Sequence, residues 1–241
     1  MHPPHTTSQS TEAPPQESQT PSRSAWWSRL TFAIQLVAMI AAVLTARASV
    51  ADHYHVPTGS MEPTIQIGDR ILVNKLAYGL RLPMFEMRLF ERAPSRGDVI
   101  VFMAPHEETV MVKRLIGLPG DRLAFDGRQV TINGEPAAAS RRPDGSLWED
   151  LGGVTHPLHP ESYQGPRQLP LKIPQGQYFV MGDHRGNSSD SRVWGLVPEE
   201  NLLGRAVAVI YSDERDLPWS ERWWIPLSLT GSASADPRLA R

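Results

Sequence analysis

The segment VPTGSMEPTIQIGD, residues 56–69, is the first place in the sequence where residue types and spacing point to chemistry. Ser60 follows Gly59 and lies between Pro57 and Pro63, so the backbone is stiff and non-helical, and the glycine allows another chain to approach closely. Such a segment suits a nucleophile. The same composition is also ordinary for a loop, and a serine needs a base before it can attack a carbonyl carbon.

The base for Ser60 is not encoded next to it. A G-x-S-x-G elbow with a histidine partner is absent, because Glu62 stands where the second glycine would be. A Ser-x-x-Lys pair is absent as well, because Pro63 occupies the lysine position. The histidines that a triad would draw on are His53, His55, His106, His156, His159 and His184. Histidine is the weaker option, and the base must come from elsewhere in the fold.

Lys113 is the strongest local candidate for that base. It lies in the run TVMVKRLIGL, residues 109–118, whose other members are mostly apolar and can remove water from an ammonium group. A free lysine with a pKa near 10.4 is neutral about 0.1% of the time at pH 7.5, whereas a pKa of about 8.5 gives roughly 10% neutral amine at a cost of about 2.6 kcal/mol. The alternative is that Lys113 and Arg114 end a strand at the surface.

Three segments together resemble the signature boxes of bacterial type I signal peptidases. They are TGSMEPTI (58–65), KRLIGLPGDRLAF (113–125) and YFVMGDHRGNSSDSR (178–192); GDVIVF (97–102) resembles a further strand of that family, and the resemblance covers about residues 26–211. It implies a serine endopeptidase that removes N-terminal signal peptides from exported preproteins after small residues, at A-x-A sites. Ser60 would be the nucleophile and Lys113 the general base, and the Ser60 N–H with the Thr58 hydroxyl would form the oxyanion hole.

The third box is expected to support this pair. By the resemblance, Ser188 orients the lysine amine, and Asp183, Asp190 and Arg192 form an internal set of ion pairs and turn bonds that fixes Ser188 near Lys113.

This sequence also departs from the family at three positions. Thr58 stands where Ser or Gly is frequent, His184 replaces a common Asn, and Gly186 replaces a residue that is often acidic. None of these changes removes a proposed catalytic atom.

The residues from 52 to 241 are predicted to form a β-rich catalytic domain, because short apolar runs alternate with turn signals. The predicted strands lie in residues 70–78, 97–105, 109–118, 121–134, 177–183 and 201–212. Asp126-Gly127 and Asn133-Gly134 are candidate two-residue turns. The Pro- and Gly-rich stretch 135–170 is predicted to be an irregular excursion from the main sheet. We therefore expect a mainly β fold, an antiparallel sheet preceded by one N-terminal transmembrane helix.

The first 24 residues are predicted to be a disordered tail, and residues 25–47 a transmembrane anchor with no charge between Arg29 and Arg47. A buried core helix, an interfacial helix and a cleaved secretory signal ending at Ala46-Arg47-Ala48 are the alternatives. Charge asymmetry favours a cytoplasmic N-terminus, so the catalytic domain would lie on the outer face of the bacterial cytoplasmic membrane.

The amino-acid composition limits the classes of partner that this chain is expected to bind. The net charge is −2 and cysteine is absent, so neither a nucleic-acid surface nor a thiolate site is expected. No cofactor and no metal are expected; the His53/His55 pair lacks a third ligand at a recognisable spacing. Signal peptides and a lipid bilayer are the expected partners, and the oligomeric state stays open.

Trp219, Trp223 and Trp224 are candidates for the membrane interface or for the core.

Rival functions are a Ser/Lys processing peptidase of a conjugative or specialised secretion system, a self-cleaving repressor, and a non-enzymatic tethered β domain. The repressor lacks a helix-turn-helix segment.

Overall fold

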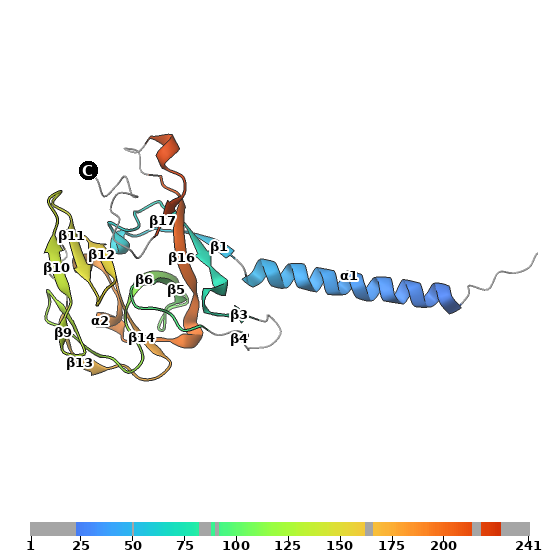
Figure 1. Cartoon of the computed structure of the whole chain (residues 1–241), viewed down its shortest axis with the longest axis horizontal. Coiled ribbons are helices and arrows are strands. Elements are labelled where there is room, and N and C mark those ends of the chain that lie inside the picture. The colour runs from blue at the N-terminus through green and yellow to red at the C-terminus, as the bar shows by residue number, and fades with distance from the viewer. Residues whose placement is uncertain are drawn as a thin grey trace, which may run out of the picture. The chain divides into compact units, whose positions relative to one another are not determined.

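The structure is a computed structural model that describes residues 23–49, 51–81, 88–89, 92–161, 166–213 and 218–227. The chain divides into two units, residues 1–44 and residues 45–241 (Figure 1). The predicted tail lies outside the described residues up to position 22.

The first unit contains most of helix α1, Arg23–Ser49, which begins slightly before and ends slightly after the predicted span of 25–47. The helix has neither Gly nor Pro, and Leu, Ala and Met favour helical backbone. Among the residues that the structure describes, no helix is both long enough and apolar enough to cross a membrane. The assignment of α1 as a membrane anchor therefore stays a prediction.

The second unit is mainly antiparallel β, which confirms the predicted fold class (Figure 1). Its largest sheet has the order β1-β2-β16-β5-β6-β14-β15, with β17 beside β16. These strands are β1 (Ala51–His55), β2 (Arg70–Asn74), β5 (Val99–Met103), β6 (Val110–Gly117), β14 (Gln177–Met181), β15 (Val197–Pro198), β16 (Leu202–Tyr211) and β17 (Ile225–Pro226). The predicted runs at 70–78, 97–105, 109–118, 177–183 and 201–212 each contain one of them.

Smaller sheets and short helices complete this unit. One sheet has the order β13-β7-β8-β9, another β10-β11-β12 and a third β3-β4. Their strands are β3 (Leu80–Arg81), β4 (Arg88–Leu89), β7 (Arg122–Phe125), β8 (Val130–Ile132), β9 (Glu135–Pro136), β10 (Ala138–Arg141), β11 (Leu147–Asp150), β12 (Thr155–Leu158) and β13 (Gln168–Lys172). The short helices are η1 (Gly59–Met61), η2 (Lys75–Tyr78), η3 (Arg185–Asn187), α2 (Ser191–Trp194), η4 (Glu199–Asn201) and η5 (Trp219–Glu221).

The stretch 135–170 is more regular than the sequence suggested. It contributes β9, all of the β10-β11-β12 sheet and the start of β13, and none of these strands pairs with the largest sheet. Proline and glycine here punctuate short strands instead of preventing them.

Repeated Gly-Asp dipeptides build one kind of turn three times. Gly68, Gly97 and Gly120 all have φ near +90°, a region that glycine tolerates best. In each case the following aspartate accepts a hydrogen bond from the backbone N–H three residues before it, at 2.9 Å for Asp69, 3.0 Å for Asp98 and 2.7 Å for Asp121. Asp98 and Asp121 thereby secure the turns on either side of β5 and β6.

The two predicted hairpin turns have different outcomes. Asn133 and Gly134, with φ of 55° and 91°, form the expected two-residue turn between β8 and β9. The prediction at Asp126-Gly127 is wrong, because β7 and β8 pair only from Phe125 and Val130 outward. The Asp126 carboxylate accepts hydrogen bonds from two backbone N–H groups within the resulting four-residue loop.

The core fixes the segment that carries Ser60. Met61 and Ile65 are fully buried in a cluster with Ile71, Val73 and Val99, among others. Burying side chains of this size contributes about 1.5–3 kcal/mol each. The turn around Ser60 is therefore held by hydrophobic residues on its C-terminal side.

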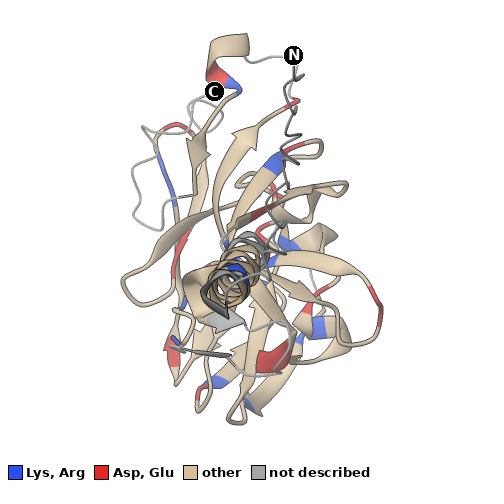
Figure 2. Cartoon of the chain, turned by 90° about the vertical axis from the view of Figure 1, so that its right-hand side faces the viewer, with Lys and Arg blue, Asp and Glu red and all other residues tan. Residues whose placement is uncertain are grey.

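Charges of both signs are interspersed over the described chain (Figure 2). No single basic face stands out in this view, in keeping with the net charge of −2.

Candidate active site

Ser60 and Lys113 meet although they are 53 positions apart in sequence. Ser60 lies in η1, just after β1, and Lys113 lies on β6 opposite Ile100 of β5. Lys113 Nζ donates to Ser60 Oγ at 2.6 Å and to the carbonyl of Val112 at 3.1 Å. When the amine is neutral, its lone pair can accept the serine proton along the same contact.

Burial gives the lysine the properties of a base. Lys113 is 5% exposed. Desolvation lowers its pKa to about 8, against the opposing attraction of Asp190 and Asp183. With that pKa about a quarter of the side chains are neutral at pH 7.5, compared with about 0.1% for a free lysine.

Gly182 lets the third sequence box lie against the serine. A Cβ at this position would lie 2.3 Å from the carbonyl oxygen of Ser60 and 2.4 Å from Ser188 Oγ, both far inside contact distance. The backbone N–H of His184 donates to the same Ser60 carbonyl at 3.1 Å. Any side chain at position 182 would therefore displace either Ser60 or Ser188.

Asp183 joins three segments through a buried ion pair. Its carboxylate accepts hydrogen bonds from Arg114 Nε at 2.7 Å and Arg114 Nη2 at 2.6 Å, and another from Thr64 Oγ1 at 2.5 Å. Burial alone would raise the pKa of Asp183, but the Arg114 guanidinium outweighs it and the pKa lies well below its usual range. The strand carrying Lys113 is thus tied to the loop that follows Ser60.

Asp190 and Arg192 form a second buried pair. Arg192 Nε and Nη2 each donate to the Asp190 carboxylate at 2.7 Å. Asp190 also accepts from the backbone N–H of Gly182 at 3.0 Å and caps α2 through the backbone N–H of Arg192. The expected set of Asp183, Asp190 and Arg192 is therefore divided between two arginines, because Asp183 pairs with Arg114.

A further buried network links the 135–170 stretch to the third box. Arg185 forms a two-pronged ion pair with Glu149, and His156 Nε2 lies 3.2 Å from the same carboxylate. His156 Nδ1 lies 3.4 Å from Asp183. Sequence reasoning missed the roles of Arg185, Glu149 and His156, since nothing in their spacing signals that they meet.

Ser188 and Thr58 are held less firmly by side-chain hydrogen bonds than the residues above. Ser188 Oγ is buried, and it has no hydrogen-bond partner among the residues described. Thr58 is exposed, precedes η1 without a side-chain cap bond, and lines the cavity in front of Ser60.

That cavity has a volume of about 470 Å³ and is walled by two segments. Residues 54–60 form one wall and residues 109–113 the other, with Asn187 and Ser189 at its border. One edge of β6 pairs with β5 along residues 110–114, whereas β14 covers the other edge only from Arg114 onward. In the described part of the chain, the second edge of residues 110–112 therefore has no strand partner beside the cavity.

A serine hydroxyl within hydrogen-bond reach of a buried lysine of lowered pKa, facing an open cavity, is the constellation of a hydrolase with a lysine base. Comparison with known proteins agrees with that class. Residues 29–211 match the family model described as signal peptidase, peptidase S26. The chain therefore belongs to the signal peptidase family of S26 peptidases, and it is a serine peptidase.

Individual relatives support the same family. The chain is 40% identical over 190 residues to "Signal peptidase I" of Pseudomonas fluorescens, an alignment that covers 69% of this chain and 67% of the relative. It is 31% identical to "Signal peptidase I" of Haemophilus influenzae, covering 77% and 70%. A crystal structure of a signal peptidase I from Enterococcus faecalis matches 47% of this chain and 97% of that chain, with 29% identity and a TM-score of 0.33. The family model and these two relatives confirm the resemblance to signal peptidases, and the family supports signal-peptide removal as the activity.

Proposed function

We propose that this chain is a membrane-anchored serine endopeptidase that removes N-terminal signal peptides from exported preproteins, with Ser60 as nucleophile and Lys113 as general base. The observation that carries the proposal is the 2.6 Å contact between Ser60 Oγ and the buried Lys113 Nζ. Family membership supports the substrate class.

The reaction proceeds in two halves. Neutral Lys113 takes the hydroxyl proton as Ser60 Oγ bonds to the scissile carbonyl carbon. The lysine ammonium then gives that proton to the leaving amine, and the C–N bond breaks to leave an acyl-enzyme. Lys113 next takes a proton from water, whose oxygen attacks the ester; the proton returns to Ser60 Oγ, and the signal peptide leaves as a carboxylic acid.

The oxyanion of each tetrahedral intermediate is stabilised by the Ser60 N–H and the Thr58 hydroxyl. The start of η1 leaves backbone N–H groups without partners inside the helix, which supports the first of these donors. Thr58 lines the same cavity. Each donor in comparable sites contributes about 3–4 kcal/mol to transition-state stabilisation.

The third box positions the base. Ser188 is proposed to orient the Lys113 amine: its buried Oγ makes no hydrogen bond among the described residues, and it lies beside Gly182, close to the Ser60 carbonyl. Asp183, Asp190 and Arg192 hold this segment through buried pairs that leave few alternative arrangements.

The substrate binds as an added strand. An extended peptide can pair with the open edge of residues 110–112, which leads directly to Lys113. Because side chains of a strand alternate, two positions of the peptide point into the cavity and favour small residues in an A-x-A pattern. Thr109–Val112 line one side of that cavity.

The anchor is α1, predicted over residues 25–47, with a cytoplasmic N-terminus and the catalytic domain on the outer face of the bacterial cytoplasmic membrane. The absence of charge between Arg29 and Arg47 supports this assignment. Trp219, Trp223 and Trp224 are 79%, 58% and 63% exposed, which suits contact with the membrane interface.

The direct test is processing of a preprotein in detergent by the variants Ser60→Ala and Lys113→Ala. Both should lose cleavage while keeping the wild-type circular dichroism spectrum, and wild-type-like cleavage by either would refute the pair. A panel of signal peptides with enlarged residues at the two small positions tests the specificity. Uniform cleavage of that panel would favour the alternative of a specialised processing peptidase with another substrate.

A further inference from the structure

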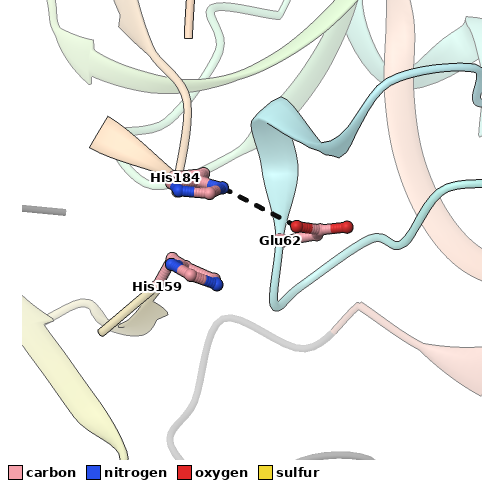
Figure 3. Close-up of side chains that lie close together, drawn as sticks. All are labelled: Glu62, His159 and His184. Carbon is pink, nitrogen blue, oxygen red and sulfur yellow. Dashed lines mark ion pairs between the residues drawn. The ribbon is translucent and has the colours of Figure 1, made fainter. Parts of the chain in front are cut away.

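Glu62, His159 and His184 lie together beside the candidate active site (Figure 3). One donor atom from each residue lies within 4.8 Å of the others. His184 Nδ1 is 3.6 Å from the Glu62 carboxylate, and the two imidazole rings stack with centroids 3.8 Å apart. All three side chains are half-buried, so part of the cluster is open to solvent.

The cluster joins three segments that are far apart in sequence. Glu62 follows η1, His159 follows β12 and His184 precedes η3. Their backbones are already fixed relative to one another, because His159 N donates to Asp183 O at 3.1 Å and His184 N donates to Ser60 O at 3.1 Å. A group bound by these side chains would therefore find their backbones fixed, so that only side-chain rotation is needed to bring the ligands together.

The side chains are not used by other strong bonds of the described structure. His184 Nδ1 is a buried atom that makes no hydrogen bond among the described residues. His159 Nδ1 accepts one long hydrogen bond, 3.3 Å from the backbone N–H of Glu161. The Glu62 carboxylate lies over Gly59, whose missing side chain leaves room for it: a Cβ there would be 2.8 Å from the carboxylate oxygens.

Two imidazole nitrogens and one carboxylate oxygen form a ligand set that suits zinc. Ligands about 2.0–2.2 Å from a tetrahedral ion are separated from one another by roughly 3.3–3.6 Å. To bind one ion, the donor atoms need to approach by about 1 Å, and the half-buried His159 ring would have to rotate out of its stack with His184.

We propose that Glu62, His159 and His184 form a binding site for a divalent cation of the zinc type, with water as the fourth ligand on the open side. The ion would fasten the loop after Ser60 to the third box and to the end of β12. This proposal departs from the expectation of no metal, which rested on spacing in the sequence, whereas the three proposed ligands come from distant segments. The site is separate from the proposed peptidase chemistry, which uses no metal in any step.

The test is metal binding by the full chain in detergent, without a histidine tag, measured by calorimetry with Zn²⁺ and by the visible absorption of Co²⁺. Wild type should bind one ion at this site. Glu62→Gln, His159→Gln and His184→Asn should each weaken binding by more than about 100-fold, since even outer-shell changes cost 10–100-fold. Zn²⁺ should raise the melting temperature of wild type and leave that of His184→Asn unchanged.

The control is the double variant His53→Ala/His55→Ala, which removes two histidines that are not members of the cluster. It should bind Zn²⁺ within about threefold of wild type. Melting in EDTA reports whether each variant is folded, without any need for cleavage. Undiminished binding by His184→Asn, loss of binding in the control alone, or no binding by wild type would each overturn the proposal and leave the proposed peptidase function untouched.

Discussion

Replacing Lys113 by methionine keeps the length of the side chain and removes its charge, which isolates the free energy stored in the buried ammonium. The pKa is about 8 in the folded chain, against 10.5 for the unperturbed group. A depressed lysine pKa opposes folding below the folded value, where both states are protonated, and the penalty is lost as pH rises toward 10.5. A difference of this size corresponds to about 3 kcal/mol at pH 7 and about 2 kcal/mol at pH 9.

The lost hydrogen bonds to Ser60 Oγ and Val112 O oppose this gain by about 1 kcal/mol each. Lys113→Met should therefore be more stable than wild type by about 1 kcal/mol at pH 7 and about equal at pH 9. Denaturant unfolding of both full chains in detergent at the two pH values measures the difference.

Ser60→Ala is the matched control for this comparison, because it removes one of the same hydrogen bonds and leaves the buried charge. Its stability relative to wild type should not change between pH 7 and pH 9. If the Lys113→Met difference is equally flat, the lysine is not desolvated in the folded chain and the reasoning fails.

Further predictions concern the pH profile and the packing around the site. Cleavage, measured as kcat/KM, should rise with pH about a midpoint near 8 if neutral Lys113 acts as the proposed base; a midpoint near 10 would contradict its burial. Gly182→Ala should reduce cleavage by about 100-fold or more, since its Cβ has no room, whereas Gly186→Ala on the exposed turn of η3 should cleave like wild type. Arg114→Met should lower the free energy of unfolding by about 3–5 kcal/mol, because it leaves the Asp183 carboxylate buried without its arginine. The double variant Arg114→Met/Asp183→Asn should recover part of that loss in denaturant unfolding. Additive losses from the two changes would argue against a coupled pair.

The strands were predictable because their cause is local. Alternating or continuous apolar residues between turn signals mark β2, β5, β6, β14 and β16, and glycine with aspartate marks the turns between them. Strands without such a local pattern of apolar residues and turn signals were predicted less well. The 135–170 stretch has many prolines and glycines, yet its short strands gain stability from one another in a separate sheet, a tertiary effect that composition does not show.

The site was predictable only through the joint occurrence of three sequence boxes. Neither periodicity nor spacing relates Ser60 to a lysine 53 positions later. The Arg114–Asp183 pair spans 69 positions and the Arg185–Glu149 pair spans 36, so both depend on which strands the fold brings together. Pairings of this kind exist only once the sheets have formed.

The buried pairs explain how a lysine surrounded by carboxylates can still have a lowered pKa. Asp183 and Asp190 both favour the Lys113 ammonium, but the desolvation of Lys113 outweighs their attraction. Each of these carboxylates is bound by its own arginine through two hydrogen bonds, Asp183 by Arg114 and Asp190 by Arg192. The positive charge of each arginine weakens the attraction between its carboxylate and the Lys113 ammonium. The two arginines thereby let the third box hold buried acidic residues without keeping Lys113, the proposed base, protonated. A lysine in the same position beside unpaired carboxylates would remain an ammonium and could not accept the serine proton.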